Sequence, residues 1–217
     1  MIRNNTTHLF LVLFILFMYA CDTTVAQTND FRLLDQNSDA KHKIRETALN
    51  IHTIHCDFIQ IKRMHYLDSD LKSSGKFWYY KPDKVRWEYI QPYEYIIILN
   101  QEKISLISNN TSNQYDVKNN NMFNQMNELI VDAVSGNIFD NSGYTTNTYE
   151  SKDLYMVKLQ PESPDITKII QNMELYFDKN SYTLNKLKII EPNSDYSLIY
   201  FSNQILNEVI PENIFIH

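Results

Sequence analysis

The first side chains of reactive type that lie close together in this sequence are His52, His55 and Cys56. A catalytic thiol requires a depressed pKa and a nearby base, and two histidines three residues apart on a helix can share a metal ion. Neither a Cys₂His₂ spacing nor an H-E-x-x-H sequence accompanies them. The hydrophobic pattern indicates the end of an amphipathic helix that enters a strand. We therefore predict no metal site, and a half-buried structural thiol at Cys56 rather than a catalytic one.

Glycine is rare in the chain and occurs only at positions 75, 136 and 143. A Walker loop, a dinucleotide fingerprint and a G-x-S-x-G nucleophile elbow each require several glycines at fixed spacing. The carboxylates are spread along the chain, and spacing alone does not make an acid–base pair of any two. These patterns predict no catalytic residue, no cofactor and no enzymatic activity.

The N-terminus has the three parts of a secretory signal. Arg3 gives a short positive start, Leu9–Ala20 is an unbroken apolar run, and small residues follow it. The apolar run is too short for a permanent membrane span. We predict a cleaved signal peptide over residues 1–26 and a single exported domain over residues 27–217. Cleavage before Cys21, with a lipid anchor on that cysteine, is the alternative.

The formal net charge of the chain is −6. Residues 1–26 contain one basic and one acidic residue, so the mature chain keeps that charge. An acidic exported domain is a poor match for nucleic acid or for an anionic membrane surface. The mature chain also keeps a single cysteine, so it cannot form an internal disulfide.

Short runs rich in β-branched and aromatic residues alternate with turn signals and predict an antiparallel meander. Two amphipathic helices are predicted, from Phe31 to about Ile54 and from Asn119 to about Ser135, the second ending at Gly136. The polar stretch Asn137–Ser151 is predicted to be a connection. The predicted strands begin near Phe58 and continue at Lys72–Tyr80, Lys84–Ile90, Tyr95–Leu99, Lys103–Ser108, Asn113–Val117, Leu154–Leu159, Gln171–Asp178, Leu184–Glu191, Tyr196–Asn203 and Val209–Ile210.

Aromatic residues form 13% of the chain and are dense in Gly75–Leu99, which reads GKFWYYKPDKVRWEYIQPYEYIIIL. Strands favour aromatic residues, so these rings could form an ordinary sheet core. They could equally hold the apolar part of a ligand, since tyrosine and tryptophan combine a large apolar surface with a polar group. Residue types and spacing leave both interpretations open.

This stretch resembles the LolA family of periplasmic carriers of outer-membrane lipoproteins. Gly75–Tyr89 and the following Gln91-Pro92-Tyr93 give a Gly-x-aromatic-Trp strand, a basic-Pro turn, an Arg-Trp-x-Tyr strand and a second Pro turn. Asp57-Phe58-Ile59-Gln60 is similar to the Phe-x-Gln entry of the family's first strand. Leu159-Gln160-Pro161 and the strands after it resemble the closing hairpins, so the resemblance covers most of residues 40–216.

The resemblance implies a mainly β (α+β) fold, an incomplete and strongly curved antiparallel β-barrel of about ten to eleven strands. Helices are expected to form a lid over its concave hydrophobic face. The implied function is that of a monomeric periplasmic carrier that shields the acyl chains of lipoproteins. Its implied partners are acylated lipoproteins, an inner-membrane lipoprotein-releasing ABC transporter and an outer-membrane lipoprotein receptor.

The two-residue alternation of a strand puts every second side chain of Gly75–Tyr89 on one face. Together with the resemblance, this alternation predicts the wall of the lipid-binding cavity: Phe77, Tyr79, Val85, Trp87 and Tyr89. Plain core packing is the alternative interpretation of each of these side chains.

The second helix is expected to supply the underside of the lid, where adaptable methionines suit a variable acyl chain. The residues of this underside are Met122, Met126, Leu129 and Ile130. Lys81 stands where the family usually has an arginine before the proline, and the resemblance assigns that residue to holding the lid through helix carbonyls. A lysine lacks the guanidinium fork and makes fewer fixed bonds.

Two other functions remain open at this point. A membrane-anchored lipid or lipoprotein receptor or sensor on the same fold would carry its anchor on Cys21. An enzyme that reuses the curved sheet for a small aromatic substrate would need polar groups that converge in the cavity. The expected inner face offers few of these besides Lys81 and tyrosine hydroxyls.

Overall fold

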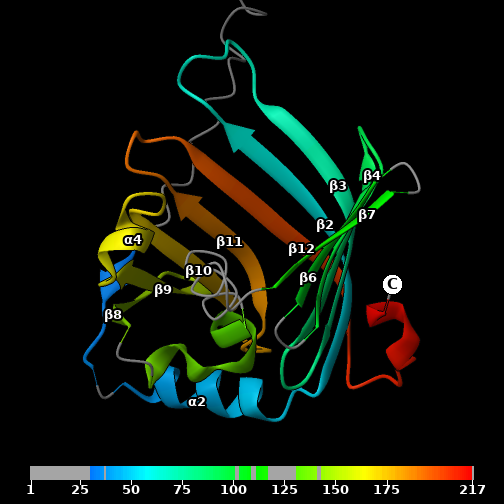
Figure 1. Ribbon diagram of the computed structural model, residues 1–217. Coiled ribbons are helices and arrows are strands. Elements are labelled where there is room, and N and C mark those ends of the chain that lie inside the picture. The colour runs from blue at the N-terminus through cyan, green and yellow to red at the C-terminus, as the bar shows by residue number, and fades with distance from the viewer. Residues whose placement is uncertain are drawn as a thin grey trace, which may run out of the picture. The chain divides into compact units, whose positions relative to one another are not determined.

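The computed structural model describes residues 30–36, 38–100, 103–108, 111–116, 131–140 and 143–216 (Figure 1). Phe31–His217 form one compact unit. The predicted signal peptide, residues 1–26, lies outside the described residues. No helix among the described residues is long and apolar enough to cross a membrane.

The unit is built on one antiparallel sheet of twelve strands. Its strand order is β1-β8-β9-β10-β11-β12-β2-β3-β4-β5-β6-β7, so the edge strands β1 and β7 do not pair and the sheet stays open. Figure 1 shows the two halves of the sheet bending around a common interior. The strands are β1 (Arg32–Leu33), β2 (Thr53–Arg63), β3 (Leu71–Tyr80), β4 (Lys84–Gln91), β5 (Tyr95–Asn100), β6 (Lys103–Ser108), β7 (Thr111–Asp116), β8 (Tyr144–Glu150), β9 (Leu154–Pro161), β10 (Asn172–Asp178), β11 (Leu184–Ile190) and β12 (Tyr196–Leu206).

The prediction of an open, strongly curved antiparallel sheet is therefore confirmed, with twelve strands instead of ten to eleven. The polar stretch Asn137–Ser151 is not a simple connection, because β8 occupies its second half and pairs with β9. Its threonines and tyrosines are good strand formers, and Tyr144 and Thr148 are buried. Val209–Ile210 forms no strand but belongs to the segment between β12 and the 3₁₀ turn η3 (Glu212–Phe215).

The first predicted helix is shorter than expected, since α2 spans Asp39–Leu49 only. Ala40, Ile44 and Ala48 recur at four-residue spacing and are the buried residues of this helix. β2 begins at Thr53 and takes the residues expected at the helix end, because they pair with β3. In Figure 1, α2 runs along the lower end of the curved sheet.

The short elements lie between the strands or follow the last one. η2 (Asn137–Phe139) lies against α2 and follows Gly136, whose φ of 80° is left-handed and ends the helical residues 131–135 as predicted. α4 (Pro164–Thr167) connects β9 to β10. The polypeptide that follows β12 covers part of the convex face, where Ile210 and Phe215 pack against Ile98 and Ile107.

The sheet has an apolar inner face and a mixed outer face because side chains alternate along every strand. On β2, Cys56 and Phe58 are buried in the main core. Ile59, which points to the other side, is 51% exposed. The main core therefore occupies the concave side of the curved sheet.

Candidate functional site

The five residues predicted for the cavity wall lie together on the concave face. Phe77 pairs with Trp87 and Tyr79 with Val85 across β3 and β4. Tyr89 pairs with Gly75 at the next level, and all five residues belong to or pack against the main core. The alternation thus predicted their common face correctly, while their contact with lipid stays a prediction.

An aromatic cluster joins this wall to β2. The ring of Phe58 lies edge-on to Trp87 and Tyr89, at centroid distances of 5.0 Å and 4.9 Å. Phe77 lies 4.6 Å from Trp87, and both contact Phe201 of β12 at 5.8 Å and 6.0 Å. Rings in contact at such distances stabilise each other beyond their burial alone. The cluster makes β12, β2, β3 and β4 one continuous apolar surface.

Tyr89 carries the polar group of this surface. Its hydroxyl donates a hydrogen bond to Oε1 of Gln60 at 2.7 Å, and its ring stacks on Tyr95 at 4.2 Å. Burial raises the pKa of Tyr89 above its usual range, and burial also raises the pKa of Tyr95. Both hydroxyls therefore stay neutral at physiological pH and act as hydrogen-bonding groups inside the hollow.

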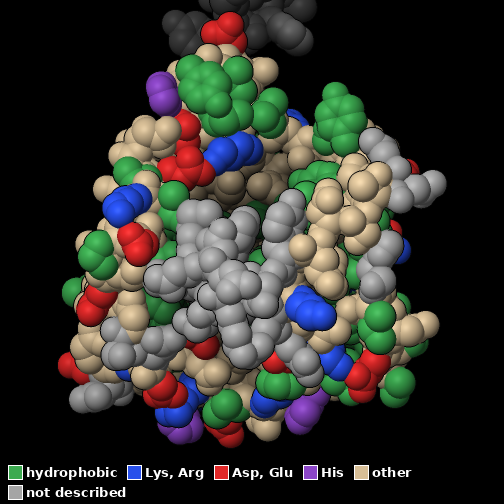
Figure 2. All heavy atoms as spheres, viewed as in Figure 1, with side chains coloured by type: hydrophobic (Ala, Val, Ile, Leu, Met, Phe, Trp, Pro, Cys, Tyr) green, Lys and Arg blue, Asp and Glu red, His purple; other side chains and the backbone are tan. Residues whose placement is uncertain are grey.

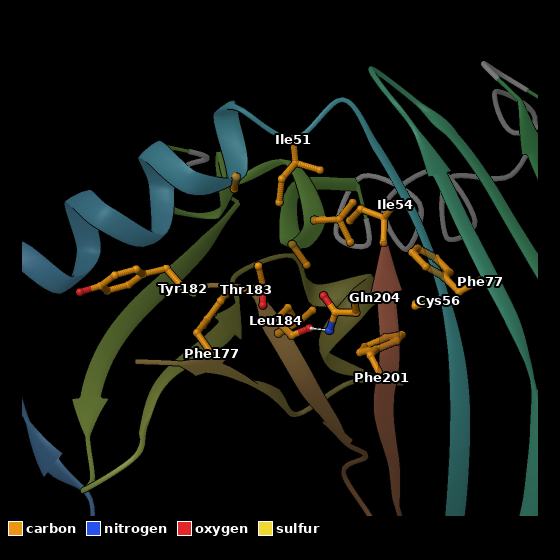
Figure 3. A pocket seen from close by; sticks show the side chains of 13 residues that line it. Ile51, Ile54, Cys56, Phe77, Phe177, Tyr182, Thr183, Leu184, Phe201 and Gln204 are labelled. Atoms are coloured by element: carbon orange, nitrogen blue, oxygen red, sulfur yellow. Dashed lines mark hydrogen bonds between the residues drawn. The ribbon is translucent and has the colours of Figure 1, made fainter. Parts of the chain in front are cut away.

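A pocket opens at the α2 end of the concave face (Figure 3). It is almost entirely apolar, and its walls come from α2, the helical residues 131–135 and the strands β2, β3, β10, β11 and β12. Figure 3 shows Ile51 and Ile54 above this space, Phe177 and Leu184 below it, and Phe77, Cys56 and Phe201 together at one end. The lining residues are Ala48, Ile51, Ile54, Cys56, Phe77, Ala133, Val134, Phe177, Tyr182, Thr183, Leu184, Phe201 and Gln204.

The free space in this pocket is small, at about 30 Å³. That volume holds no more than a few water molecules. An acyl chain could enter only if one wall moved away. α2 and the residues 131–135 are helical walls outside the sheet, so they can move without breaking strand pairing.

The histidines and the cysteine singled out first do not form a site. His52 follows α2 in the chain, whereas His55 lies in β2 and stacks on Trp78 at 5.1 Å. The two histidines share no helix face, because β2 begins at Thr53. Cys56 lies within β2 and is 2% exposed, so it is more deeply buried than expected. Burial, with a smaller effect of the Asp57 charge, raises the pKa of its thiol to about 12, which leaves it protonated and unreactive.

Lys81 connects the end of β3 to α2. Its Nζ donates a hydrogen bond to the backbone carbonyl oxygen of Leu49, at 2.9 Å, and Leu49 is the last residue of the helix. Its backbone N–H donates to the carbonyl oxygen of His52 at 2.8 Å, which fixes the position of the residue independently of its side chain. The side chain therefore touches the helix that forms one wall of the pocket.

The residues expected for the underside of the lid, Met122, Met126, Leu129 and Ile130, lie outside the described residues. The helical residues that follow them, 131–135, do contribute Ala133 and Val134 to the pocket. The walls supplied by Phe177, Leu184 and Phe201 were not among the predicted residues. Alternation along β10 and β12 could have given the inner face of Phe177 and Phe201. Leu184 reaches this face only through the register shift between β10 and β11.

Solved structures share this architecture at low sequence identity. A LolA superfamily protein from Nitrosomonas europaea matches with 10% identity and a TM-score of 0.48, over 82% of this chain and 97% of the other. A DUF1329 family protein from Desulfovibrio piger matches with 10% identity and a TM-score of 0.50, over 82% and 95%. The MucA/MucB complex structure of Pseudomonas aeruginosa matches with 9% identity and a TM-score of 0.45, over 83% and 61%.

Comparison with curated protein sequences gave no match. A sequence-family model does match, and it covers residues 49–216. The matched part includes every strand of the sheet from β2 onward, the aromatic wall and the Lys81 turn. The family so described is outer membrane lipoprotein carrier protein LolA, and the chain belongs to this LolA family.

Proposed function

We propose that this protein is a periplasmic carrier that binds the acyl chains of lipoproteins on its concave face and moves them from the inner to the outer membrane. The observation that carries the proposal is the continuous apolar surface inside an open sheet, ending in an apolar pocket below a helix held by one lysine. Membership in the LolA family supports it. No catalytic step and no cofactor is part of the proposal.

The physical need for such a carrier follows from the hydrophobic effect. Each methylene group removed from water contributes about 0.8 kcal/mol, so an acyl chain does not leave a membrane for water unprotected. A carrier must also release its cargo. The nearly filled pocket suits this need, because the free energy spent on moving α2 or the residues 131–135 lowers the net affinity.

The proposed partners are a lipoprotein-releasing ABC transporter in the inner membrane and a lipoprotein receptor in the outer membrane. Export through a signal peptide at residues 1–26, and action as a monomer, are part of the same proposal.

The test is to express the full chain with its signal, isolate the exported protein under mild conditions, and identify bound molecules by mass spectrometry. We expect a triacylated lipoprotein to copurify. Trp87→Glu should abolish this association, since it places a charge in the centre of the aromatic cluster. Ile59→Glu is the matched control, because Ile59 is exposed on the convex face and should leave the association intact.

Two possible results from the same preparation would contradict the proposal. If neither lipoprotein nor lipid is ever bound, the carrier function is wrong. If Trp87→Glu, folded by circular dichroism, still binds as well as Ile59→Glu, the concave wall is not the binding surface. An N-terminal sequence that begins with an acylated cysteine would replace the soluble shuttle with an anchored receptor.

A further inference from the structure

The concave face changes from apolar to polar along β2. The side chains that β2 directs inward are Ile54, Cys56 and Phe58, followed by Gln60 and Lys62. Ile54 lines the pocket at the α2 end, and Gln60 is bonded to the Tyr89 hydroxyl. The change therefore runs from the pocket to the opposite end of the hollow.

The neighbouring strands make the same change, β3 at the level of Gln60 and β12 one step further from α2. On β3, Phe77 pairs with Cys56, whereas Ser73 pairs with Gln60. On β12, the apolar residue Ile199 still pairs with Gln60, and the change comes one step later, where Ser197 pairs with Lys62. Three adjacent strands thus carry a polar band across one end of an apolar wall.

A second recess lies at this polar end. It has a volume of about 610 Å³, and its lining combines Glu191, Asn193 and Ser197 with the apolar residues Ile169, Ile170, Ile189 and Pro192. Lys62 forms an ion pair with Glu191 at its edge, with both side chains partly exposed. In Figure 2 the hollow on the concave side is bordered by a basic and an acidic side chain. Water therefore reaches the polar band.

This gradient matches the chemistry of an acylated N-terminus, which has apolar chains at one end and ester, amide and peptide groups at the other. We propose that Gln60, Ser73, Ser197 and Lys62 form a polar subsite for these ester and amide linkages, with the acyl chains directed toward α2. The subsite rests on the proposed carrier function and specifies which part of the cargo each end of the hollow binds. If acyl chains lay against these hydrogen-bonding groups instead, the groups would lose contact with water without gaining partners, and the free energy of binding would be less favourable.

The first experiment compares two probes of defined chemistry. A synthetic triacylated cysteinyl lipopeptide has the linkages, whereas palmitate has a chain without them. In the full exported protein, Gln60→Leu combined with Ser73→Ala should weaken binding of the lipopeptide roughly five- to tenfold, through the loss of two hydrogen-bonding groups. Palmitate binding should change by less than about twofold, since the chain end of the hollow is unaltered.

The matched control is Ser74→Ala, whose side chain alternates to the other face of β3. It should bind both probes as the unchanged protein does. Equal losses for both probes, or no loss for the lipopeptide, would overturn the subsite while leaving the carrier function in place. If the unchanged protein binds neither probe, both the subsite and the carrier function are wrong.

A second measurement needs no substitution in the subsite. Trp87 lies at the level of Phe77 and Cys56, two steps from Gln60 toward α2. Bromine in the half of each acyl chain that ends in the methyl group should therefore quench the fluorescence of Trp87 more strongly than bromine beside the ester groups. Equal quenching, or stronger quenching by bromine beside the ester, would overturn the orientation.

Discussion

The Nζ atom of Lys81 donates a hydrogen bond of 2.9 Å to the carbonyl oxygen of Leu49, and this bond ties the β3–β4 turn to the last residue of α2. The carbonyl groups of a final helical turn lack partners within the helix. A cation there is favourable both because it donates a hydrogen bond to such a carbonyl and because it interacts with the negative end of the helix dipole. α2 contributes Ala48 to the pocket wall. A single side chain outside the helix thus acts on the element that limits access to the pocket.

Replacing Lys81 tests this connection. Lys81→Met should raise hydrogen exchange in the last turn of α2 and lower the free energy of unfolding by about 0.5–1.5 kcal/mol, the net value of one such bond. Lys81→Arg should slow the release of a bound lipopeptide, because its fork can bond more than one carbonyl. Hydrogen-exchange mass spectrometry and a stopped-flow release assay measure the two effects.

Lys76→Met is the control for that pair, since Lys76 is an exposed lysine on the convex face of β3, the strand that ends just before Lys81. It should leave α2 exchange and lipopeptide release unchanged. If Lys76→Met and Lys81→Met accelerate exchange in α2 to the same extent, the bond to Leu49 does not hold the helix.

Local pattern and the family resemblance together predicted much of the fold and one wall of the site. The alternation in Gly75–Tyr89, together with the family resemblance, gives the common face of Phe77, Trp87 and their neighbours. Pattern failed at β8, where polar Tyr144–Glu150 pairs with β9. Threonine and tyrosine suit a strand, but Tyr144–Glu150 has no aliphatic residues that alternate with polar ones, so its place in the sheet becomes clear only from its pairing with β9.

The other wall depends on contacts between distant parts of the chain. Phe201 reaches Phe77 because β12 pairs with β2, and nothing in the local sequence specifies this partner. The polar band at Gln60 likewise could not be predicted from local sequence, since Ser197 joins it only through the pairing of β12 with β2. Alternation gives the face of a residue, and the sheet order gives its neighbours.

Gly75 is required by the close approach of β4. A Cβ atom at this position would lie 1.9 Å from the carbonyl oxygen and 2.8 Å from the carbonyl carbon of Glu88. Both are backbone atoms, so β4 itself would have to move. Gly75→Ala should lower the free energy of unfolding by about 3 kcal/mol or more, measured as a shift in the urea midpoint.

The neighbouring Ser74→Ala introduces no such contact and should change the free energy of unfolding by less than about 0.5 kcal/mol. Indistinguishable urea midpoints for the two variants would show that β3 and β4 can separate at Glu88 without cost.

Cys56 offers a direct measure of pocket occupancy. Its pKa is raised from 9.0 to about 12, which lowers the thiolate fraction at pH 8 about a thousandfold. We expect the folded mature protein to react very slowly with a disulfide reagent, and to react at an ordinary rate in urea. Because Cys56 lines the pocket, bound lipopeptide should slow the reaction further. A faster reaction with lipopeptide present would mean that the acyl chains do not occupy this pocket.

The same burial predicts how stability depends on pH. Cys56 and Tyr79 both have a pKa of about 12 in the folded protein, against ordinary values of 9.0 and 10.0, and burial is the main cause for each. Above pH 9 the folded state therefore binds more protons than the unfolded state, so the free energy of unfolding falls as pH rises from 9 to 12. Below pH 9 the contribution of both groups is constant.

For Cys56 alone the loss at pH 10.5 is on the order of 2 kcal/mol. Urea unfolding of the protein and of Cys56→Ala, measured from pH 8 to pH 10.5, isolates this share. Cys56→Ala should be less stable at pH 8, because a buried sulfur is removed, yet it should lose stability more slowly as the pH rises. The two curves should therefore converge. Parallel curves would show that the thiol ionises in the folded state as readily as in the unfolded chain, and hence that β2 opens to water at this point of the pocket.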